Sequence, residues 1–150
     1  MWAEDAPRPP KNAPKSENVN FNGRKMPRKN TPFFAIGVKV QDGAPDTISI
    51  SVYFSDALDA HSVVSHHISI DGKQIPDTTE FLFNKTRHMV RFEIKKADFS
   101  LDTQKTFSLT LTGARSFDGR TTKSIELSAL EKGTFSKYDK ETGEWQKSSL

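Results

Sequence analysis

The amino-acid sequence predicts an all-β fold, an antiparallel β-sandwich of about seven strands. From residue 33 onward, hydrophobic and polar residues alternate with a period of two, which is typical of strands that bury one face. The other face of these strands is polar, whereas the strands of a parallel α/β sheet are apolar on both faces. No segment carries the 3.6-residue period of a long helix.

Composition divides the 150 residues into an arm over 1–32, a sandwich over 33–130 and a tail over 131–150. The arm holds six of the eight prolines, and residues 1–30 carry seven basic and three acidic side chains. Almost no aliphatic residue lies there, so the arm cannot bury enough surface to offset the entropy lost on ordering. We expect a flexible, extended, Pro-rich arm that carries the positive net charge.

Seven segments show the strand pattern, at residues 33–40, 47–54, 67–70, 80–83, 87–94, 105–112 and 121–129. In the first segment, Phe34, Ile36, Val38 and Val40 are expected to share the core face. In the later segments the same periodicity assigns to the core Ile48, Ile50, Val52, Phe54, Ile68, Ile70, Phe81, Phe83, Val90, Phe92, Ile94, Phe107, Leu109, Leu111, Ile125 and Leu127.

Between these strands the sequence predicts turns rather than helices. Asp71-Gly72 is a hairpin-turn dipeptide. Residues 56–64 are expected to form one short helical turn, with Asp59 as its cap. Gly113 and Gly119 are expected at loop corners that need a positive φ.

The tail reads as a hairpin, with Gly143 at the end of its loop and Tyr138 and Trp145 as cross-strand neighbours. An isolated hairpin is marginal in water, so this one must pack on the sandwich or on a partner. Three alternatives remain open: a pair of added edge strands, a contact surface that carries aromatic side chains, or a frayed tail.

Four segments, in the correct order, resemble bacterial Ig-like domains of surface-layer and other envelope proteins. Residues 54–63, FSDALDAHSV, resemble the signature F-S-x-x-(L/V)-D-x-x-S-V, and residues 68–72, ISIDG, resemble the strand and turn that follow it. Residues 101–113, LDTQKTFSLTLTG, resemble L-x-x-G-T-x-Y-x-(L/V)-x-V-x-G, and residues 117–120, FDGR, stand where D-x-x-G-N is frequent. Two residues depart from the pattern: Gln104 replaces a Gly and Arg120 replaces an Asn.

The resemblance covers roughly residues 34–129 and implies an Ig-like sandwich, an extracytoplasmic setting and no catalytic residue. We therefore expect an exported protein, periplasmic, cell-surface or secreted. The chain itself begins without a signal-peptide pattern, and no apolar run of about 18 residues predicts a transmembrane helix. The start resembles an initiator Met placed before a mature exported N-terminus.

Catalytic and metal-binding patterns are weak. The chain has no Cys, no Gly-x-Ser-x-Gly elbow and no Gly-rich phosphate loop, so no enzyme activity or cofactor is expected. His66 and His67 are expected on opposite faces of a strand, and neither His61 nor His88 completes a known zinc spacing. The loop acids that could bind calcium are more typical of turn formers; they are Asp56, Asp59, Asp71, Asp118 and Glu126.

The leading expectation is a non-enzymatic interaction module that binds a protein or cell-surface partner through loops, a sheet face or the hairpin. The candidate contact residues are the aromatic Tyr53, Tyr138 and Trp145 and the basic Arg24, Lys25, Arg28 and Lys29. A net charge of +3 is low for a nucleic-acid module, so no nucleic-acid partner is expected.

Two alternatives from other classes stay open. A structural spacer or assembly subunit would use an unpaired edge strand. A carbohydrate-binding sandwich would use an exposed coplanar pair of aromatic rings as a stacking platform.

Overall fold

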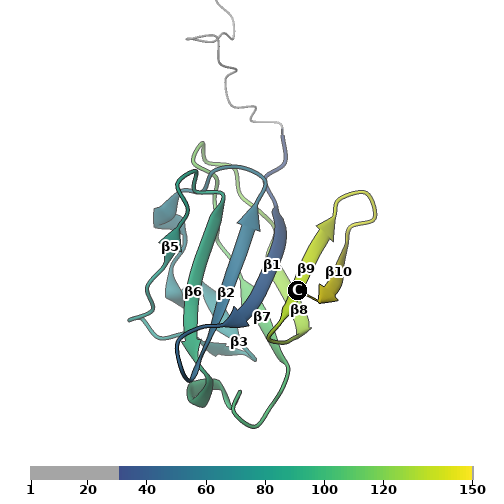
Figure 1. Cartoon of the computed structure of the whole chain (residues 1–150). Helices are drawn as coiled ribbons and strands as arrows, with labels where there is room; N and C mark the ends of the chain where they lie inside the picture. The colour runs from purple at the N-terminus through teal and green to yellow at the C-terminus, as the bar shows by residue number, and fades with distance from the viewer. Residues whose placement is uncertain (1–30, 150) are drawn as a thin grey trace, which may run out of the picture. The chain divides into compact units, whose positions relative to one another are not determined.

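The computed structural model describes residues 31–149, and these form two packed antiparallel sheets with no α-helix among them (Figure 1). The predicted arm therefore lies almost wholly outside the described residues. The elements in chain order are β1 (Ala35–Asp42), β2 (Thr47–Phe54), the 3-10 turns η2 (Ala60–Ser62) and η3 (Ser65–His67), β3 (Ile68–Ile70), β4 (Lys73–Gln74), β5 (Leu82–Phe83), β6 (Met89–Lys95), the 3-10 turn η4 (Lys96–Phe99), β7 (Phe107–Leu111), β8 (Ile125–Leu130), β9 (Thr134–Asp139) and β10 (Glu144–Ser149).

The strand order is that of an immunoglobulin-type sandwich. One sheet has the order β10-β9-β1-β2-β6-β5 and the other the order β4-β3-β7-β8. Without the last hairpin these correspond to the immunoglobulin strands A-B-E-D and C′-C-F-G. The all-β prediction is confirmed, with the short β4 as an added strand and β8 beginning at Ile125 rather than at residue 121.

The core lies between the inner faces of the two sheets, where the predicted period of two applies. On β6, Val90, Phe92 and Ile94 are buried and the residues between them are exposed. On β7, Phe107, Leu109 and Leu111 are buried in the same alternation. Each fully buried Leu, Ile or Phe side chain contributes about 1.5–3 kcal/mol, which makes this interior the main source of stability.

The first strand departs from the predicted alternation. Phe33 and Ala35 are buried, whereas Phe34 is half-buried and Ile36 is 40% exposed. The cause is a register shift in β1 between Ala35 and Gly37, after which Val38 and Val40 face the core as expected. A bulge adds one residue to one strand, so the faces exchange on either side of it. The assignment of Phe34 and Ile36 to the core was therefore wrong.

The predicted turns are confirmed. Asp71 and Gly72 both have positive φ, as the type I′ turn between β3 and β4 requires. The Asp59 side chain accepts a hydrogen bond from the His61 N–H at 3.1 Å and caps η2. Gly113 and Gly119 also adopt positive φ.

The histidine prediction needs a correction. His66 and His67 lie in the turn η3 rather than in a strand. Their side chains do not point to opposite faces of a sheet, because their ring centroids are only 4.3 Å apart. The reason is that the strand β3 begins only at Ile68, so the alternation of a strand does not reach the two histidines. His67 also packs on Gly113, where a Cβ atom would lie 2.6 Å from its Nδ1.

Candidate functional site: an aromatic strip beside the hairpin

The C-terminal hairpin extends the six-stranded sheet past β1. β9 pairs with β1 from Gly37 to Val40, and β10 pairs with β9 over six residues (Figure 1). Tyr138 and Trp145 are directly opposite each other, so the cross-strand prediction is confirmed. The Lys147 ammonium also donates a hydrogen bond to the Ala129 carbonyl of β8 in the other sheet. The hairpin therefore adds a pair of strands to the sheet, as the first of the three alternatives predicts, and its use as a contact surface stays a prediction.

Two of the predicted aromatic residues join one line of rings at this junction. Phe34 contacts Tyr138 at a centroid distance of 5.7 Å, and Tyr138 contacts Trp145 at 5.3 Å. Tyr53, on β2, contacts Phe135 of β9 at 6.3 Å, edge to face. We call these residues, together with Ile36, the aromatic strip: Phe34, Ile36, Tyr53, Phe135, Tyr138 and Trp145.

Two adjoining hollows lie along the aromatic strip. One, of about 830 Å³, is lined by Phe34, Ile36, Tyr53 and Phe135 with the hairpin residues. The other, of about 710 Å³, lies between the hairpin and residues 121–125 and is lined by Phe34, Tyr138 and Trp145. Phe34 and Tyr138 line both hollows. Tyr138 and Trp145 lie on the core-facing side of the hairpin, where Trp145 packs against the core, and Phe135 lies on its other side.

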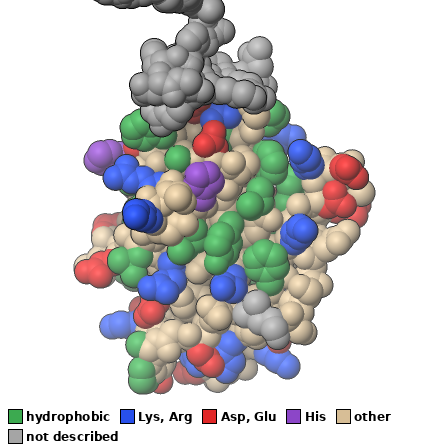
Figure 2. Space-filling model, turned by 45° about the horizontal axis from the view of Figure 1, so that its top comes forward, with side chains coloured by type: hydrophobic (Ala, Val, Ile, Leu, Met, Phe, Trp, Pro, Cys, Tyr) green, Lys and Arg blue, Asp and Glu red, His purple; other side chains and the backbone are tan. Residues whose placement is uncertain are grey.

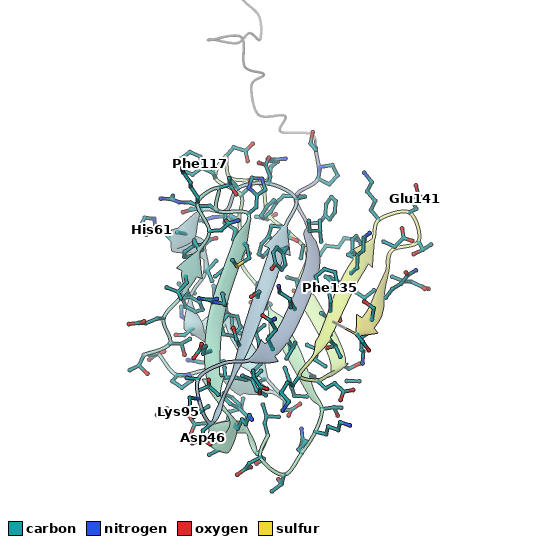
Figure 3. All side chains as sticks on the ribbon, in the orientation of Figure 1. Asp46, His61, Lys95, Phe117, Phe135 and Glu141 are labelled. Atoms are coloured by element: carbon teal, nitrogen blue, oxygen red, sulfur yellow. The ribbon has the colours of Figure 1, made fainter. Side chains whose placement is uncertain are left out.

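Charged side chains border the aromatic strip. Lys137, Asp139, Lys140 and Glu141 line the larger hollow beside the rings. Figure 2 shows hydrophobic side chains gathered on this face of the molecule with charged groups around them. In Figure 3, Phe135 lies over the sheet and Glu141 lies at the tip of the hairpin. An apolar centre with a charged rim is the arrangement found in protein interfaces.

The bulge in β1 creates this surface. It turns Phe34 and Ile36 outward, and Gly37 gives Phe135 room to lie across the strand. A Cβ atom at position 37 would lie 2.7 Å from Phe135 Cζ, closer than atoms can approach. Sequence reasoning named Tyr53, Tyr138 and Trp145 as candidate contacts, assigned Phe34 and Ile36 to the core and did not single out Phe135. Gly37, inside the predicted strand at residues 33–40, is the signal that could have indicated the bulge.

The four basic candidates, Arg24, Lys25, Arg28 and Lys29, lie outside the described residues. The structure does not show where they lie relative to the aromatic strip. Their role stays a prediction.

The end of the sandwich that carries the loops β2–β3 and β7–β8 holds an ionic network. Arg120, with a side chain only 10% exposed, binds Asp118 at 2.9 Å and also pairs with Asp56. Ser116 donates to Asp118, and the Ser116 hydroxyl accepts from the Arg120 N–H. Arg120 thus connects the two motif segments at residues 54–63 and 117–120.

These contacts shift the ionisation of the network. Burial, the largest single influence, raises the pKa of Asp56, but hydrogen bonds from Arg120 and the Ala57 N–H bring it below the ordinary value of 3.8. For Asp118, burial also raises the pKa, and the hydrogen bonds from Ser116 and Arg120 outweigh it. Hydrogen bonds to Asp118 and Asp56 raise the pKa of Arg120, so the ion pairs are intact at neutral pH.

Gln104, the other residue that departs from the resembled motifs, also connects two loops. Gln104 donates to Asp71 Oδ2 at 2.8 Å and to the Thr106 carbonyl at 2.6 Å. Asp71 also accepts from the Ser108 N–H at 2.8 Å. Both replacements, Gln104 and Arg120, therefore connect one loop to a carboxylate of another.

Four of the five carboxylates considered for calcium are engaged in the fold, and the fifth, Glu126, is exposed on β8. Asp59 pairs with Arg115 at 3.1 Å, while Asp56, Asp71 and Asp118 hold the contacts described above. Within residues 31–149 there is no group of three or more His, Asp or Glu side chains placed to hold a metal ion. The same residues include no helix long and apolar enough to cross a membrane.

Comparison of the chain with protein-family models, with curated protein sequences and with solved structures found no match in any of the three. The assignment of the fold therefore rests on the strand order and the core of this chain.

Proposed function

We propose that the protein is a non-enzymatic interaction module that binds a protein partner through the aromatic strip. The observation that carries this proposal is the outward turn of Phe34 and Ile36 at the β1 bulge, in one hollow with Tyr53, Phe135 and Tyr138. A soluble domain gains no stability by directing such side chains outward, and Trp and Tyr are enriched in interface hot spots. Binding would bury the rest of these rings without any change of charge or covalent bond.

The carbohydrate alternative has weaker support. A sugar-stacking platform needs exposed rings in one plane, and the ring pairs of the strip are tilted by 52° to 68°. The spacer alternative predicts a smooth charged surface, and the apolar strip argues against it. The assembly alternative has one observation in its favour, because β5 pairs with only two residues of β6 and leaves part of that edge uncovered.

We also infer, from the resemblance to bacterial Ig-like domains alone, that the protein is exported and acts in the cell envelope or outside the cell. An envelope extract is therefore the source of partners for the experiment. The basic residues at 24–29 could add a salt-sensitive contact to an anionic surface.

The test compares three forms of the full chain as bait: wild type, Ile36→Glu and Phe117→Glu. Ile36 lies in the strip, whereas Phe117, 74% exposed, lies at the end of the sandwich with His61 (Figure 3). Each variant puts one negative charge on an exposed apolar position. We expect Ile36→Glu to weaken retention of the partner by about tenfold or more, and Phe117→Glu to retain it.

Loss of the partner with Phe117→Glu but not with Ile36→Glu would move the site to the loops and contradict the proposal. Retention by all three baits would contradict it as well. Assay of the same variants on immobilised oligosaccharides addresses the alternative, because sugar binding lost on Ile36→Glu would favour a carbohydrate module.

A further inference from the structure

The edge of the six-stranded sheet beyond β5 is only partly covered. β6 pairs with β2 along its whole length, from Met89 to Lys95. On its other side β5 pairs with only two residues, Arg91 with Leu82 and Val90 with Phe83. In Figure 1, β5 accompanies only one end of β6, and Lys95 lies at the other end in Figure 3.

Backbone groups of two residues face this open edge. The Phe54 N–H donates to the His88 carbonyl, and the Asn84 N–H donates to the Met89 carbonyl. Even-numbered residues of this strand therefore direct their backbone groups to β2, and odd-numbered residues direct them to the β5 side. Glu93 thus presents its N–H and C=O, and Lys95 its N–H, to the edge, where no described strand pairs with them, while the Lys95 carbonyl at the N-cap of η4 accepts the first hydrogen bond of that turn.

A contact between like charges accounts for the start of β5 at Leu82 rather than at an earlier residue. In the register of β5 and β6, two more residue pairs would place Glu80 opposite Glu93. Like charges directly opposite each other destabilise an antiparallel pair. Instead, Thr79 donates to the Pro76 carbonyl in a turn, and a groove of about 590 Å³ lies along the edge. Residues Pro76, Thr78, Glu80, Leu82, Glu93 and Lys95 are among those that line it.

The open segment is complementary to itself. In an antiparallel pair of two copies with Ile94 opposite Ile94, Glu93 of one copy lies opposite Lys95 of the second, and Lys95 opposite Glu93. These residues have exposed side chains on the same face, so both contacts join opposite charges. The registers centred on Glu93 or on Lys95 would bring like charges together. Only the first of these three registers satisfies the backbone and the charges together.

We propose that two copies of this chain associate through the β6 edges, by antiparallel pairing of Glu93-Ile94-Lys95 across a two-fold axis. The pairing is isologous, as in most homodimers, and adds a hydrogen bond from the Lys95 N–H of each copy to the Glu93 carbonyl of the other. It joins two six-stranded sheets into one. The proposal uses a different surface from the aromatic strip and does not rest on the proposed function.

The test measures self-association of the full chain by sedimentation equilibrium over a range of concentrations. We expect a concentration-dependent dimer for the wild type. Glu93→Lys places Lys opposite Lys95, and Lys95→Glu places Glu opposite Glu93, so each variant weakens the dimer by about tenfold or more. Glu126→Lys and Lys123→Glu make the same charge changes at exposed positions away from this edge, and we expect them to behave as the wild type.

A mixture of the two edge variants distinguishes pairing from a general charge effect. The chain with Lys at 93 and 95 meets a chain with Glu at both positions, and both cross-strand contacts become attractive. We expect a one-to-one heterodimer from two variants that do not self-associate. A monomeric wild type at all concentrations would overturn the proposal. So would a dimer that the edge variants leave unchanged, or a mixture that stays monomeric.

Discussion

At the scale of single residues, charged side chains connect the loops at one end of the sandwich. Arg120 joins Asp56 to Asp118. A guanidinium can bind two carboxylates at once, which an amide cannot do with the same strength. The pKa values of Asp56 and Asp118 lie below their ordinary values as a result.

The first prediction concerns this network. Replacement of Arg120 by Met removes its ion pairs and should lower the free energy of unfolding by about 2 kcal/mol near neutral pH. Urea denaturation measures the change. Arg91→Met, at an exposed position on β6, is the control and should stay within about 0.5 kcal/mol of the wild type.

The same variant tests the pH dependence. The folded-state pKa values of Asp56 and Asp118 are lowered, so these carboxylates stabilise the fold above their unfolded pKa of about 3.9. That contribution is lost as the pH falls through the folded-state values. Stability of the wild type should therefore decline below about pH 4, and Arg120→Met should decline less. An equal decline in both proteins would show that the network does not titrate as described.

At the scale of elements, the bulge in β1 decides which residues meet. It exchanges the faces of Phe34 and Ile36 while Val38 and Val40 stay in the core. The open space at Gly37 then allows Phe135 of β9 to cross over the strand. One extra residue in one strand thus provides both the outward apolar side chains and the seat for the hairpin.

The second prediction addresses that seat. Gly37→Ala should destabilise the protein by about 1 kcal/mol, because its Cβ would lie 2.7 Å from Phe135 Cζ and the ring must move. In a Phe135→Ala background the same change should cost almost nothing. A double-mutant cycle of unfolding free energies measures the difference. Additive effects of the two changes would mean that the ring and the glycine do not interact.

At the scale of the whole sandwich, the two edges of the six-stranded sheet differ in how completely strands cover them. On one side β9 and β10 cover β1, and the new edge strand β10 is polar, with Lys147 directed to the Ala129 carbonyl of the other sheet. Charged and polar edge strands resist pairing with other chains. On the opposite side the short β5 leaves Glu93 and Lys95 uncovered. Two complete strands thus extend the sheet beyond β1, whereas β5 covers only part of β6.

The third prediction concerns the cover over β1. A chain that ends at residue 130 loses both β9 and β10 and exposes the edge of β1, so it should unfold at a lower temperature and aggregate. A chain that ends at residue 141 keeps β9 over β1 and should aggregate less. Thermal unfolding followed by light scattering compares the two. Equal aggregation would indicate that β9 alone does not protect β1.

The sequence predicted part of the candidate site, but not all of the residues that form it. Tyr138 and Trp145 flank a Gly-containing loop, which sets them opposite each other through local turn chemistry. Phe34, Ile36 and Phe135 were missed because their exposure depends on the pairing of β1 with strands on both sides. Periodicity within one strand contains no information on such a register shift.

The sequence by itself determined the all-β class, the core faces of β2, β6 and β7, the turns at Asp71-Gly72 and Asp59, and the hairpin. These follow from local alternation and turn chemistry, which neighbouring residues set among themselves. Only the tertiary structure decided the faces of β1, the place of His66 and His67, the joining of Asp56 to Asp118 through Arg120, and the open edge of β6. Each of these depends on which segments distant in the chain become neighbours, and register and like-charge contacts between strands decide that.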